Sequence, residues 1–355
     1  MSRGDLFSLE RQERLMAELR SRGAVRVTEL AEMLQVSPVT VRRDIAVLAQ
    51  TRRLTRVHGG AVLPVTPRRG HRPATRFTLG MVVPSLDFFW PHVITGARTA
   101  SAMLGAHLRL RGSRYDPQED HRQITRLLAD EPIDGLLLAP DVTDDLTWIS
   151  ALSVPCVLVE RPAPTWGPAA LPLESVRNDH DAGVELALRH LAEQGHQRVG
   201  AIVTPLSPNA ARIEQGFVRA CAALGLSGDL IVRTSLRPQV PDSSRLLAEV
   251  LDACGQTATT ALLVHSDPDA IALCRYAAER GLTIPDDLAL VSYDDESAHL
   301  ADPPLTAVRP AKGQVGRMAV ELLVSRLAEG DRRPAHRLQL VPDLVIRGSS
   351  LRRSP

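Results

Sequence analysis

Two adjacent arginines, Arg42 and Arg43, stand in the stretch VSPVTVRRDI. Each guanidinium group carries forked N–H donors that fit the oxygens of a phosphate or the edge of a guanine base. Residues 1–76 hold 15 arginines and no lysine against seven acidic residues, whereas the rest of the chain holds 27 basic against 34 acidic residues. A basic N-terminal segment on a mildly acidic body predicts a head that binds a polyanion.

A second group of residues, in PSLDFFWP, places Asp87 beside three of the chain's few aromatic side chains, Phe88, Phe89 and Trp90. The C–H faces of a sugar stack on aromatic rings, and its hydroxyl groups need carboxylate, amide or arginine partners. These four residues are therefore candidates for sugar contacts. Two alternatives remain open, because Phe89 or Trp90 can instead pack in the core and purines also stack on aromatic rings.

Other kinds of chemistry lack their motifs. The chain has no G-x-G-x-x-G, no P-loop and no histidines at metal-binding spacing, and its four cysteines are widely spaced without C-x-x-C. We therefore expect no enzyme activity, no metal and no cofactor, and we interpret the cysteines as reduced and buried. The first residues are too polar for a secretory signal, and no apolar run approaches the roughly 18 residues of a membrane span. We expect a cytoplasmic protein that does not contact a membrane.

Helix signals follow one another in the basic segment that must position the two arginines. Apolar residues at helical spacing predict a supporting helix over 9–22. The stretch VTELAEML at 27–34 predicts a second, short helix, for which Thr28 is a good N-cap. Ser37 is a second N-cap, and Pro38 takes the first helical position, where its missing N–H is not needed. The pattern predicts two short helices joined by a tight turn.

The third helix separates a buried side from an exposed one. Val41, Ile45 and Leu48 fall within about 40° of one direction at 100° per residue, which predicts that they face the core. The opposite side and its flanks carry Val39, Thr40, Arg42 and Arg43. Two short apolar runs, at 54–57 and 61–63, then flank HGG and predict a hairpin. This order of elements predicts a winged helix.

The motifs RQER, VSPVTVRRD and RVHGGA resemble the DNA-binding head of the DeoR family across residues 9–64. The resemblance implies a double-stranded DNA operator as partner. Arg43 and Thr40 would then read bases, Arg42 would bind phosphate and Val39 would meet a thymine methyl group. His58 would contact phosphate in the wing or only shape the hairpin. The DNA-binding candidates are Ser37, Val39, Thr40, Arg42, Arg43 and His58.

The rest of the chain predicts an α/β body. Residues 65–76 are Pro-rich, basic and without apolar period, which predicts a linker. From Phe77 on, strand-like runs such as TLGMVV, IDGLLLA and RVGAIV alternate with amphipathic helices. Such alternation predicts parallel sheets with helices on both faces, and a ligand crevice at the carboxyl ends of the strands. The length exceeds that of one small doubly wound domain.

Phrases along the body resemble, in order, the effector domain of the lactose/galactose-repressor (LacI/GalR) family; they include VPCVLVERP, LRHLAEQGHQRVGAI, DPPLTAVRP and PDLVIRGSS. The resemblance implies the periplasmic-binding-protein fold, in which two lobes, each a doubly wound parallel sheet, close over a small ligand. It places crossings between lobes near Arg161, near Tyr293 and around Val324. The implied domains are a winged helix-turn-helix at 1–64, a linker at 65–76, and an effector domain at 77–350. Lobe 1 would span about 77–161 and 294–323, and lobe 2 about 162–293 and 324–350.

The same resemblance implies ligand contacts. Asp294 in VSYDD matches the family's carboxylate, and Asp267 in HSDPDA matches its aspartate, although Asp267 can instead cap the following helix. In AARIEQGF the family's arginine position holds Ile213, so either Arg212 reaches in from a shifted turn or that contact is absent. The ligand-binding candidates are Asp87, Phe88, Phe89, Trp90, Arg161, Asp179, Arg212, Asp267 and Asp294.

These observations predict a transcriptional regulator, a repressor of carbohydrate uptake or breakdown genes, that acts as a homodimer and answers to a small neutral sugar. A regulator answering to a nucleoside, purine or other non-sugar metabolite is the second hypothesis. A binding or enzymatic body with a vestigial head is the third. In the lactose/galactose-repressor family a short hinge helix follows the DNA-binding head. The Pro-rich linker of this sequence shows no such helix, so ligand binding must be coupled to DNA binding by another route.

Overall fold

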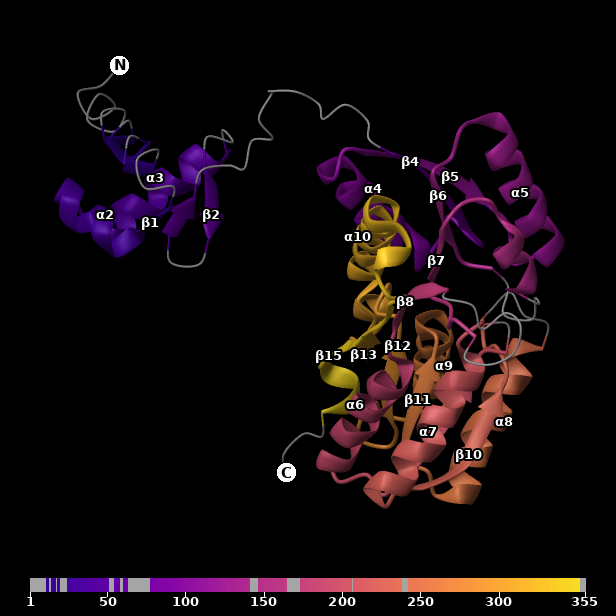
Figure 1. The fold of residues 1–355 in the computed structure, drawn as a ribbon. Coiled ribbons are helices and arrows are strands. Elements are labelled where there is room, and N and C mark those ends of the chain that lie inside the picture. Colours follow the sequence, from indigo (N-terminus) through magenta and orange to yellow (C-terminus); the bar gives the residue numbers. More distant parts are fainter. Residues whose placement is uncertain are drawn as a thin grey trace. The chain divides into compact units, whose positions relative to one another are not determined.

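A computed structural model divides the chain into two compact units, Met1–Ala74 and Thr75–Pro355, which are described one at a time (Figure 1). The predicted linker at 65–76 and His58 lie outside the residues that the structure describes. Those residues are 11–12, 14–16, 18–19, 24–50, 54–57, 60–62, 77–140, 146–164, 173–205, 207–237 and 242–351.

The N-terminal unit is a helix-turn-helix followed by a hairpin, as predicted. Helical residues between 11 and 19 precede β1 (Ala24–Arg26), α2 (Val27–Leu34) and α3 (Pro38–Gln50). β2 (Thr55–Val57) and β3 (Gly60–Val62) form the hairpin. The sequence did not indicate β1, which pairs antiparallel with β3 and makes a three-stranded sheet in the order β1-β3-β2. α2 begins one residue before Thr28, so the prediction that Thr28 precedes this helix as its N-cap is wrong.

One apolar cluster holds this unit together. Val41, Ile45 and Leu48 of α3 are at most 2% exposed and pack with Leu15 and Leu30. The buried side of α3 is therefore the predicted one. The turn between α2 and α3 is closed because Ser37 accepts a hydrogen bond from the Thr40 N–H at 3.2 Å, as expected of an N-cap.

The second unit contains two six-stranded sheets. The first has the order β14-β8-β7-β6-β4-β5 and is parallel throughout. Its strands are β4 (Phe77–Val83), β5 (Ala106–Gly112), β6 (Gly135–Leu138), β7 (Cys156–Val159), β8 (Glu174–Asn178) and β14 (Arg337–Leu340). α4 (Trp90–Met103) and α10 (Lys312–Glu329) cover one face, and α5 (Pro117–Asp130) packs on the other. A 3₁₀ helix spans Leu146–Ala151.

The second sheet has the order β10-β9-β11-β12-β13-β15, and only β15 is antiparallel to its neighbour. Its strands are β9 (Arg198–Val203), β10 (Ser227–Arg233), β11 (Ala261–His265), β12 (Ala289–Tyr293), β13 (Thr306–Arg309) and β15 (Asp343–Val345). α6 (His180–Glu193) and α7 (Ala210–Leu224) cover one face, whereas α8 (Ser243–Thr257) and α9 (Asp267–Glu279) cover the other. Short 3₁₀ helices span Ala298–Leu300, Gly330–Arg332 and Gly348–Ser350.

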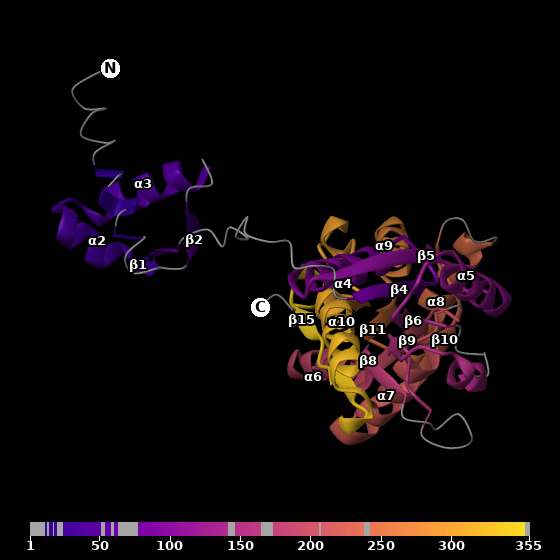
Figure 2. The ribbon, with the colours of Figure 1, turned by 45° about the horizontal axis from the view of Figure 1, so that its top comes forward.

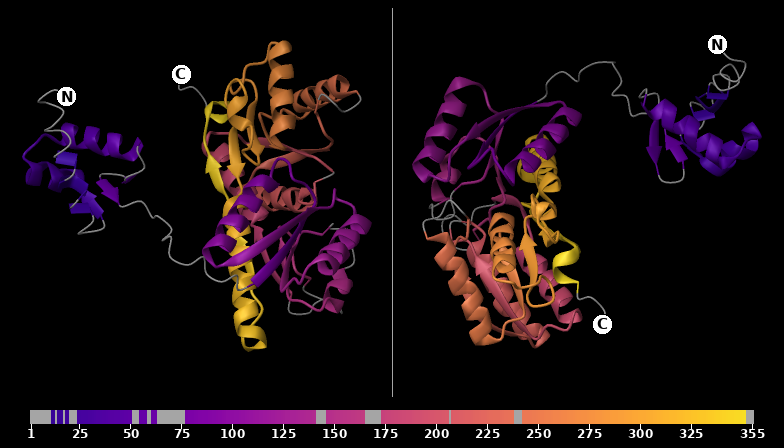
Figure 3. Two further views of the ribbon diagram at one scale, coloured as in Figure 1. Left: turned by 90° about the horizontal axis from the view of Figure 1, so that it is seen from above. Right: turned by 180° about the vertical axis from the view of Figure 1, so that it is seen from behind.

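Each sheet with its helices forms one lobe (Figure 3). From the strand order, the chain passes between the lobes three times. The crossings lie between β8 and α6, between β13 and α10, and between β14 and β15. The first lobe therefore comprises residues 77–178 and 312–340, and the second 180–309 and 343–351.

The predicted crossings near Arg161, Tyr293 and Val324, and the lobe boundaries that followed from them, are wrong. After Arg161 the chain adds β8 to the first sheet, because β8 pairs with β7. After Tyr293 it adds β13 to the second sheet, next to β12. Val324 lies inside α10, which packs on the first sheet.

α4 and α10 lie side by side in unusually close contact (Figure 2). A Cβ atom added at Gly316 would lie 1.9 Å from the Val93 carbonyl oxygen, and one at Gly96 would lie 2.0 Å from the Gly313 carbonyl oxygen. Because real Cβ atoms do not approach backbone this closely, the two helix backbones touch where only glycine fits. The two helices are therefore packed directly backbone to backbone.

Candidate functional site

The exposed side of α3 carries the predicted DNA contacts. Val39 is 70% exposed, and Arg42 and Arg43 are exposed. Neither arginine makes a hydrogen bond or ion pair with any residue that the structure describes, so both guanidinium groups are free to bind phosphate or base edges. The hydroxyl groups of Ser37 and Thr40 bond to each other at 2.9 Å, which ties both residues to the start of the helix.

The orientation of α3 depends on a buried carboxylate, Asp44. It accepts hydrogen bonds from Arg11 Nε at 2.6 Å and from Gln12 Nε2 at 3.2 Å. The bond to Asp44 raises the pKa of the Arg11 guanidinium. These bonds join two sequence motifs, RQER and VRRD, across the N-terminal unit. They hold α3 in an orientation that leaves Arg42 and Arg43 exposed.

In the second unit, a cavity of about 410 Å³ opens between the lobes. Its walls are the loops that follow β4, β5 and β7 of the first lobe and β9 to β12 of the second. This is the expected crevice at the carboxyl ends of parallel strands. All four residues of the predicted Asp87–Trp90 group line it, together with Arg161, Asp267 and Asp294.

The aromatic wall of the cavity is formed by the first lobe. The Phe88 ring is 67% exposed, whereas Trp90 is 3% exposed and also belongs to the core of this lobe. The Trp90 indole N–H donates to the Tyr115 hydroxyl at 3.2 Å, and the Phe89 ring meets Trp90 edge-on at 5.7 Å. Core packing therefore accounts for Trp90, while Phe88 offers an open face. Tyr115 was not among the predicted residues.

The opposite wall holds the Asp294 carboxylate. Burial raises its pKa to about 6, and the nearby Lys312 partly offsets this rise. The backbone of Asp294 has φ 95°, a conformation that L-residues other than Asn and Asp rarely adopt. No residue of the described ranges donates a hydrogen bond to its carboxylate. Asp294 is thus an acceptor without a donor among the described residues, and it lies in the wall of the cavity.

Asp267 has a different role from the predicted contact. Its carboxylate accepts from the Ser292 hydroxyl at 2.5 Å and from the backbone N–H groups of Glu296 and Ser297 at 2.6 and 2.9 Å. It does not cap its own helix either, because Ser266 and Asp269 form the capping box of α9. Asp267 therefore shapes the turn after Asp294, and little of its acceptor capacity remains for a ligand.

The arginine of the second lobe that lines the cavity is Arg237, which the sequence analysis missed. Its Nη2 donates to the Ser266 hydroxyl at 3.3 Å. Arg212 does not line the cavity, and Ile213 is fully buried in the core of this lobe. No motif pointed to Arg237, which lies in an irregular loop after β10. Arg161 lines the first-lobe wall, where its Nε donates to the Pro140 carbonyl at 2.5 Å.

Three further residues, Asp179, Glu160 and His265, lie in or near the cavity region. Asp179 does not line the cavity, because it is the N-cap of α6 and accepts from the Ala182 N–H at 3.2 Å. Glu160 and His265 line the cavity without having been predicted. Glu160 accepts from Asn178 Nδ2 at 2.6 Å, and its second oxygen lies 3.7 Å from His180 Nε2 without a hydrogen bond from the described residues. Burial lowers the pKa of His265 to about 4, which keeps the ring neutral.

Other site classes find no support in the described part of the chain. No group of three or more His, Cys, Asp or Glu side chains there could hold a metal ion. None of the described helices combines the length and apolar character of a membrane span. All four cysteines are free thiols, and Cys156 is only half-buried.

Comparison with known proteins agrees with this geometry. Residues 11–66 match the DeoR-like helix-turn-helix domain, and residues 188–350 match the periplasmic binding protein-like domain. The transcriptional repressor PurR of Haemophilus influenzae (strain PittEE) is 27% identical over 343 residues, which cover 91% of this chain and 98% of that protein.

Two solved structures are similar. The transcriptional regulator CelR in complex with cellobiose is 27% identical, with a TM-score of 0.64, and covers 89% of this chain and 92% of that one. The lac repressor dimer bound to operator and an anti-inducer is 23% identical, with a TM-score of 0.66, covering 78% and 94%. The chain therefore joins a DeoR-like helix-turn-helix domain to a periplasmic binding protein-like domain of the kind found in LacI-type repressors.

Proposed function

We propose that the protein is a transcriptional repressor of genes for carbohydrate uptake or breakdown. It binds operator DNA through α3, and a small neutral sugar in the interlobe cavity controls it. A ligand changes DNA affinity only through its different affinities for two arrangements of the protein, typically by about 1–3 kcal/mol. The full-length likeness to a named repressor supports the regulatory role.

The DNA part rests on Arg42 and Arg43. Both are exposed, Arg43 opposite the core side of α3 and Arg42 on its flank, and buried Asp44 fixes the position of the helix. Two guanidinium groups side by side on a helix fit a major groove, where one reaches phosphate and the other a guanine edge. By analogy with the lac repressor dimer, the protein acts as a homodimer on a two-fold operator.

One observation carries the sugar part: an open aromatic face and an unpartnered carboxylate share a cavity of about 410 Å³, a volume in the range of small-ligand sites. Phe88 can stack on the C–H face of a sugar, and Asp294 can accept hydrogen bonds from its hydroxyl groups. Arg237 supplies donors from the same lobe as Asp294.

The charge of the cavity favours a neutral ligand. Among the described residues its lining holds two guanidinium groups, Arg161 and Arg237, and five carboxyl groups, those of Asp87, Glu160, Asp267, Asp294 and Glu296. A phosphorylated sugar or a free nucleotide would bring further negative charge into an acidic cavity, which Coulomb repulsion opposes. A nucleoside or purine remains the second candidate, because it is uncharged and its ring also stacks on Phe88.

A thermal-shift screen of the full-length protein tests the proposal. The panel contains ribose, galactose and cellobiose, their phosphorylated counterparts, and adenosine, guanosine and hypoxanthine. Binding to the folded state raises the melting temperature by mass action. We expect at least one neutral sugar to raise it and its phosphate ester not to do so. A shift with purines alone would favour the second candidate, and a shift with phosphate esters alone would contradict the charge argument.

The DNA part needs its own test. DNA fragments that the protein selects from a random library are titrated with wild type and with Arg42→Ala and Arg43→Ala variants at several salt concentrations. Loss of a phosphate contact weakens binding and lowers the salt slope by about one. Unchanged affinity and slope in both variants would contradict the assignment of α3.

A further inference from the structure

The first residue of α10, Lys312, is a buried cation at the border between the lobes. It is 5% exposed, and its ammonium group donates to the Asp294 carbonyl oxygen and to the Glu296 carboxylate. α10 belongs to the first lobe, whereas Asp294 and Glu296 belong to the second. One side chain of the first lobe therefore holds both the backbone and a side chain of the turn after β12.

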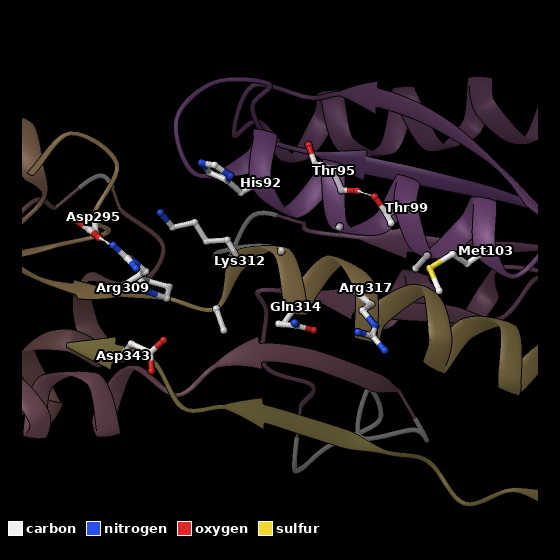
Figure 4. Close-up of a pocket in the computed structure, with 15 residues that line it drawn as sticks. His92, Thr95, Thr99, Met103, Asp295, Arg309, Lys312, Gln314, Arg317 and Asp343 are labelled. Atoms are coloured by element: carbon white, nitrogen blue, oxygen red, sulfur yellow. Dashed lines mark hydrogen bonds and ion pairs between the residues drawn. The ribbon is translucent and has the colours of Figure 1, made fainter. Parts of the chain in front are cut away.

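A second side chain from the first lobe reaches the same carboxylate. His92 of α4 lies with its Nε2 atom 3.2 Å from Glu296 Oε2. In Figure 4 the Lys312 side chain extends from the start of α10 toward the turn that carries Asp295, with His92 close by on α4. The Phe89 ring, which lines the ligand cavity, lies 5.6 Å from the Lys312 ammonium. We call Lys312, Glu296 and His92 the interlobe latch.

The turn held by the latch has a strained backbone. Asp294 and Asp295 are both non-glycine residues with positive φ, at 95° and 50°. Such conformations persist only where surrounding contacts impose them, and they gather at functional sites. Ion pairs with Arg309 at 2.6 Å and Arg347 at 2.8 Å hold the Asp295 side chain from within the second lobe. From the first lobe, Lys312 holds the Asp294 carbonyl, and with it the direction of the cavity's free carboxylate.

The position of Lys312 at the start of α10 does not stabilise that helix. A positive charge at a helix N-terminus opposes the helix dipole, and burying an ammonium group is unfavourable unless acceptors surround it. Among the described residues, both oxygen acceptors that Lys312 bonds to, on Asp294 and Glu296, belong to the second lobe. The α4 and α10 backbones touch at Gly96 and Gly316, so Lys312 stands on a helix packed directly against α4, which begins beside the aromatic wall.

We propose that the interlobe latch fixes the Asp294 turn against the first lobe, and that Lys312 is a positioning residue for effector binding that links the cavity to α4 and α10. The inference rests on the proposed function for its ligand, but not for the latch itself. A ligand that engages Asp294 and stacks beside Phe89 acts on both sides of the latch. It therefore binds one lobe arrangement better than another, which supplies the coupling route that needs no hinge helix.

Hydrogen exchange of the ligand-free, full-length protein tests the latch. The amides of Glu296 and Ser297, bonded to Asp267, report on the turn. We expect Lys312→Met to speed their exchange about tenfold or more. Glu296→Gln should act in the same direction, and the double variant should exchange no faster than Lys312→Met alone. Arg317→Met is the control, because Arg317 lies on the same helix and, among the described residues, its ion pair is with Glu321 of that helix. Unchanged exchange in Lys312→Met, or full additivity of the two changes, would overturn the latch.

A binding titration tests the positioning role. Wild type and Lys312→Met are titrated with ribose, galactose and cellobiose from pH 5 to pH 8. Four groups face Asp294: Lys312 and His180, which lower its pKa, and Asp267 and Glu296, which raise it. For the sugar that wild type binds, the variant should bind about tenfold more weakly and its pH midpoint should move upward, a shift that a merely structural role would not cause. An unmoved midpoint would overturn the positioning role. If wild type binds none of the three sugars, the sugar proposal fails while the exchange experiment still decides the latch.

Discussion

The Asp294→Asn variant should be more stable than wild type at neutral pH while losing its ligand. The Asp294 carboxyl has no hydrogen-bond donor in the described structure and lies largely buried, so its ionised form is disfavoured in the folded protein. Asparagine keeps the size and adopts positive φ more readily than other residues, so the change removes the charge without disturbing the backbone at φ 95°.

The magnitude follows from the pKa. Burial raises it from the usual 3.8 to about 6, so the folded protein holds this proton more tightly than the unfolded chain does. The stability that the group contributes is fully present below pH 3.8 and is lost as the pH rises through 6. A shift of about two units corresponds to about 3 kcal/mol, which partial solvent access reduces to about 2 kcal/mol. Asparagine does not titrate, so the variant avoids this loss.

Thermal unfolding at pH 4 and pH 7.5 measures the effect. We expect Asp294→Asn to raise the melting temperature of the second unit by about 4 °C at pH 7.5 and to leave it nearly unchanged at pH 4. Asp87→Asn is the control, because Asp87 lines the same cavity but is exposed. Equal or lower stability of Asp294→Asn at pH 7.5 would refute the reasoning, as would the same gain at both pH values.

Three further changes test the packing and the cavity. Gly316→Ala should lower the melting temperature by more than 5 °C, because its Cβ would lie 1.9 Å from backbone. Gly255→Ala is the control, because a Cβ there meets open space and should stabilise α8 by about 0.5–1 kcal/mol. Equal effects of the two changes would contradict the close contact between α4 and α10. Asp44→Ala should destabilise the N-terminal unit by about 2 kcal/mol in denaturant unfolding, and an unaffected unit would show that the buried bonds contribute nothing. Arg237→Ala should weaken sugar binding in calorimetry about tenfold and Arg212→Ala should not, and the reverse order would restore the sequence-based assignment.

Local patterns in the sequence predicted most of the helices and strands, but not which strands pair with one another. Apolar runs such as TLGMVV and RVGAIV became β4 and β9, and the buried face of α3 was the expected one. Short strands such as β8, with the sequence ESVRN, carry little apolar signal and escaped notice. The lobe crossings depend on which strand pairs with which across long separations. Nothing local distinguishes a strand that extends its own sheet from one that begins another, so the predicted crossings were displaced.

Site residues could be predicted where a recognisable motif directly follows a strand. They could not be predicted where the conformation of an irregular loop determines which side chain reaches the cavity. Asp294 and the aromatic group come directly after apolar strands, and both line the cavity. Arg237 sits in an irregular loop without a motif, and His265 ends a strand that reads only as apolar. Asp267 has the residue type of a ligand contact, but backbone N–H groups of a distant turn occupy its carboxylate. That arrangement exists only in the folded chain.

The central claim is that occupancy of the interlobe cavity changes the affinity of α3 for DNA. The most direct test measures the affinity of the full-length protein for DNA that it selects, with and without the sugar that raises its melting temperature, in wild type and Asp294→Asn. We expect a change of about 5- to 150-fold in wild type and none in the variant, whose affinity for DNA without sugar stays the same. A sugar that binds wild type without changing DNA affinity, or one that acts equally on the variant, would contradict it.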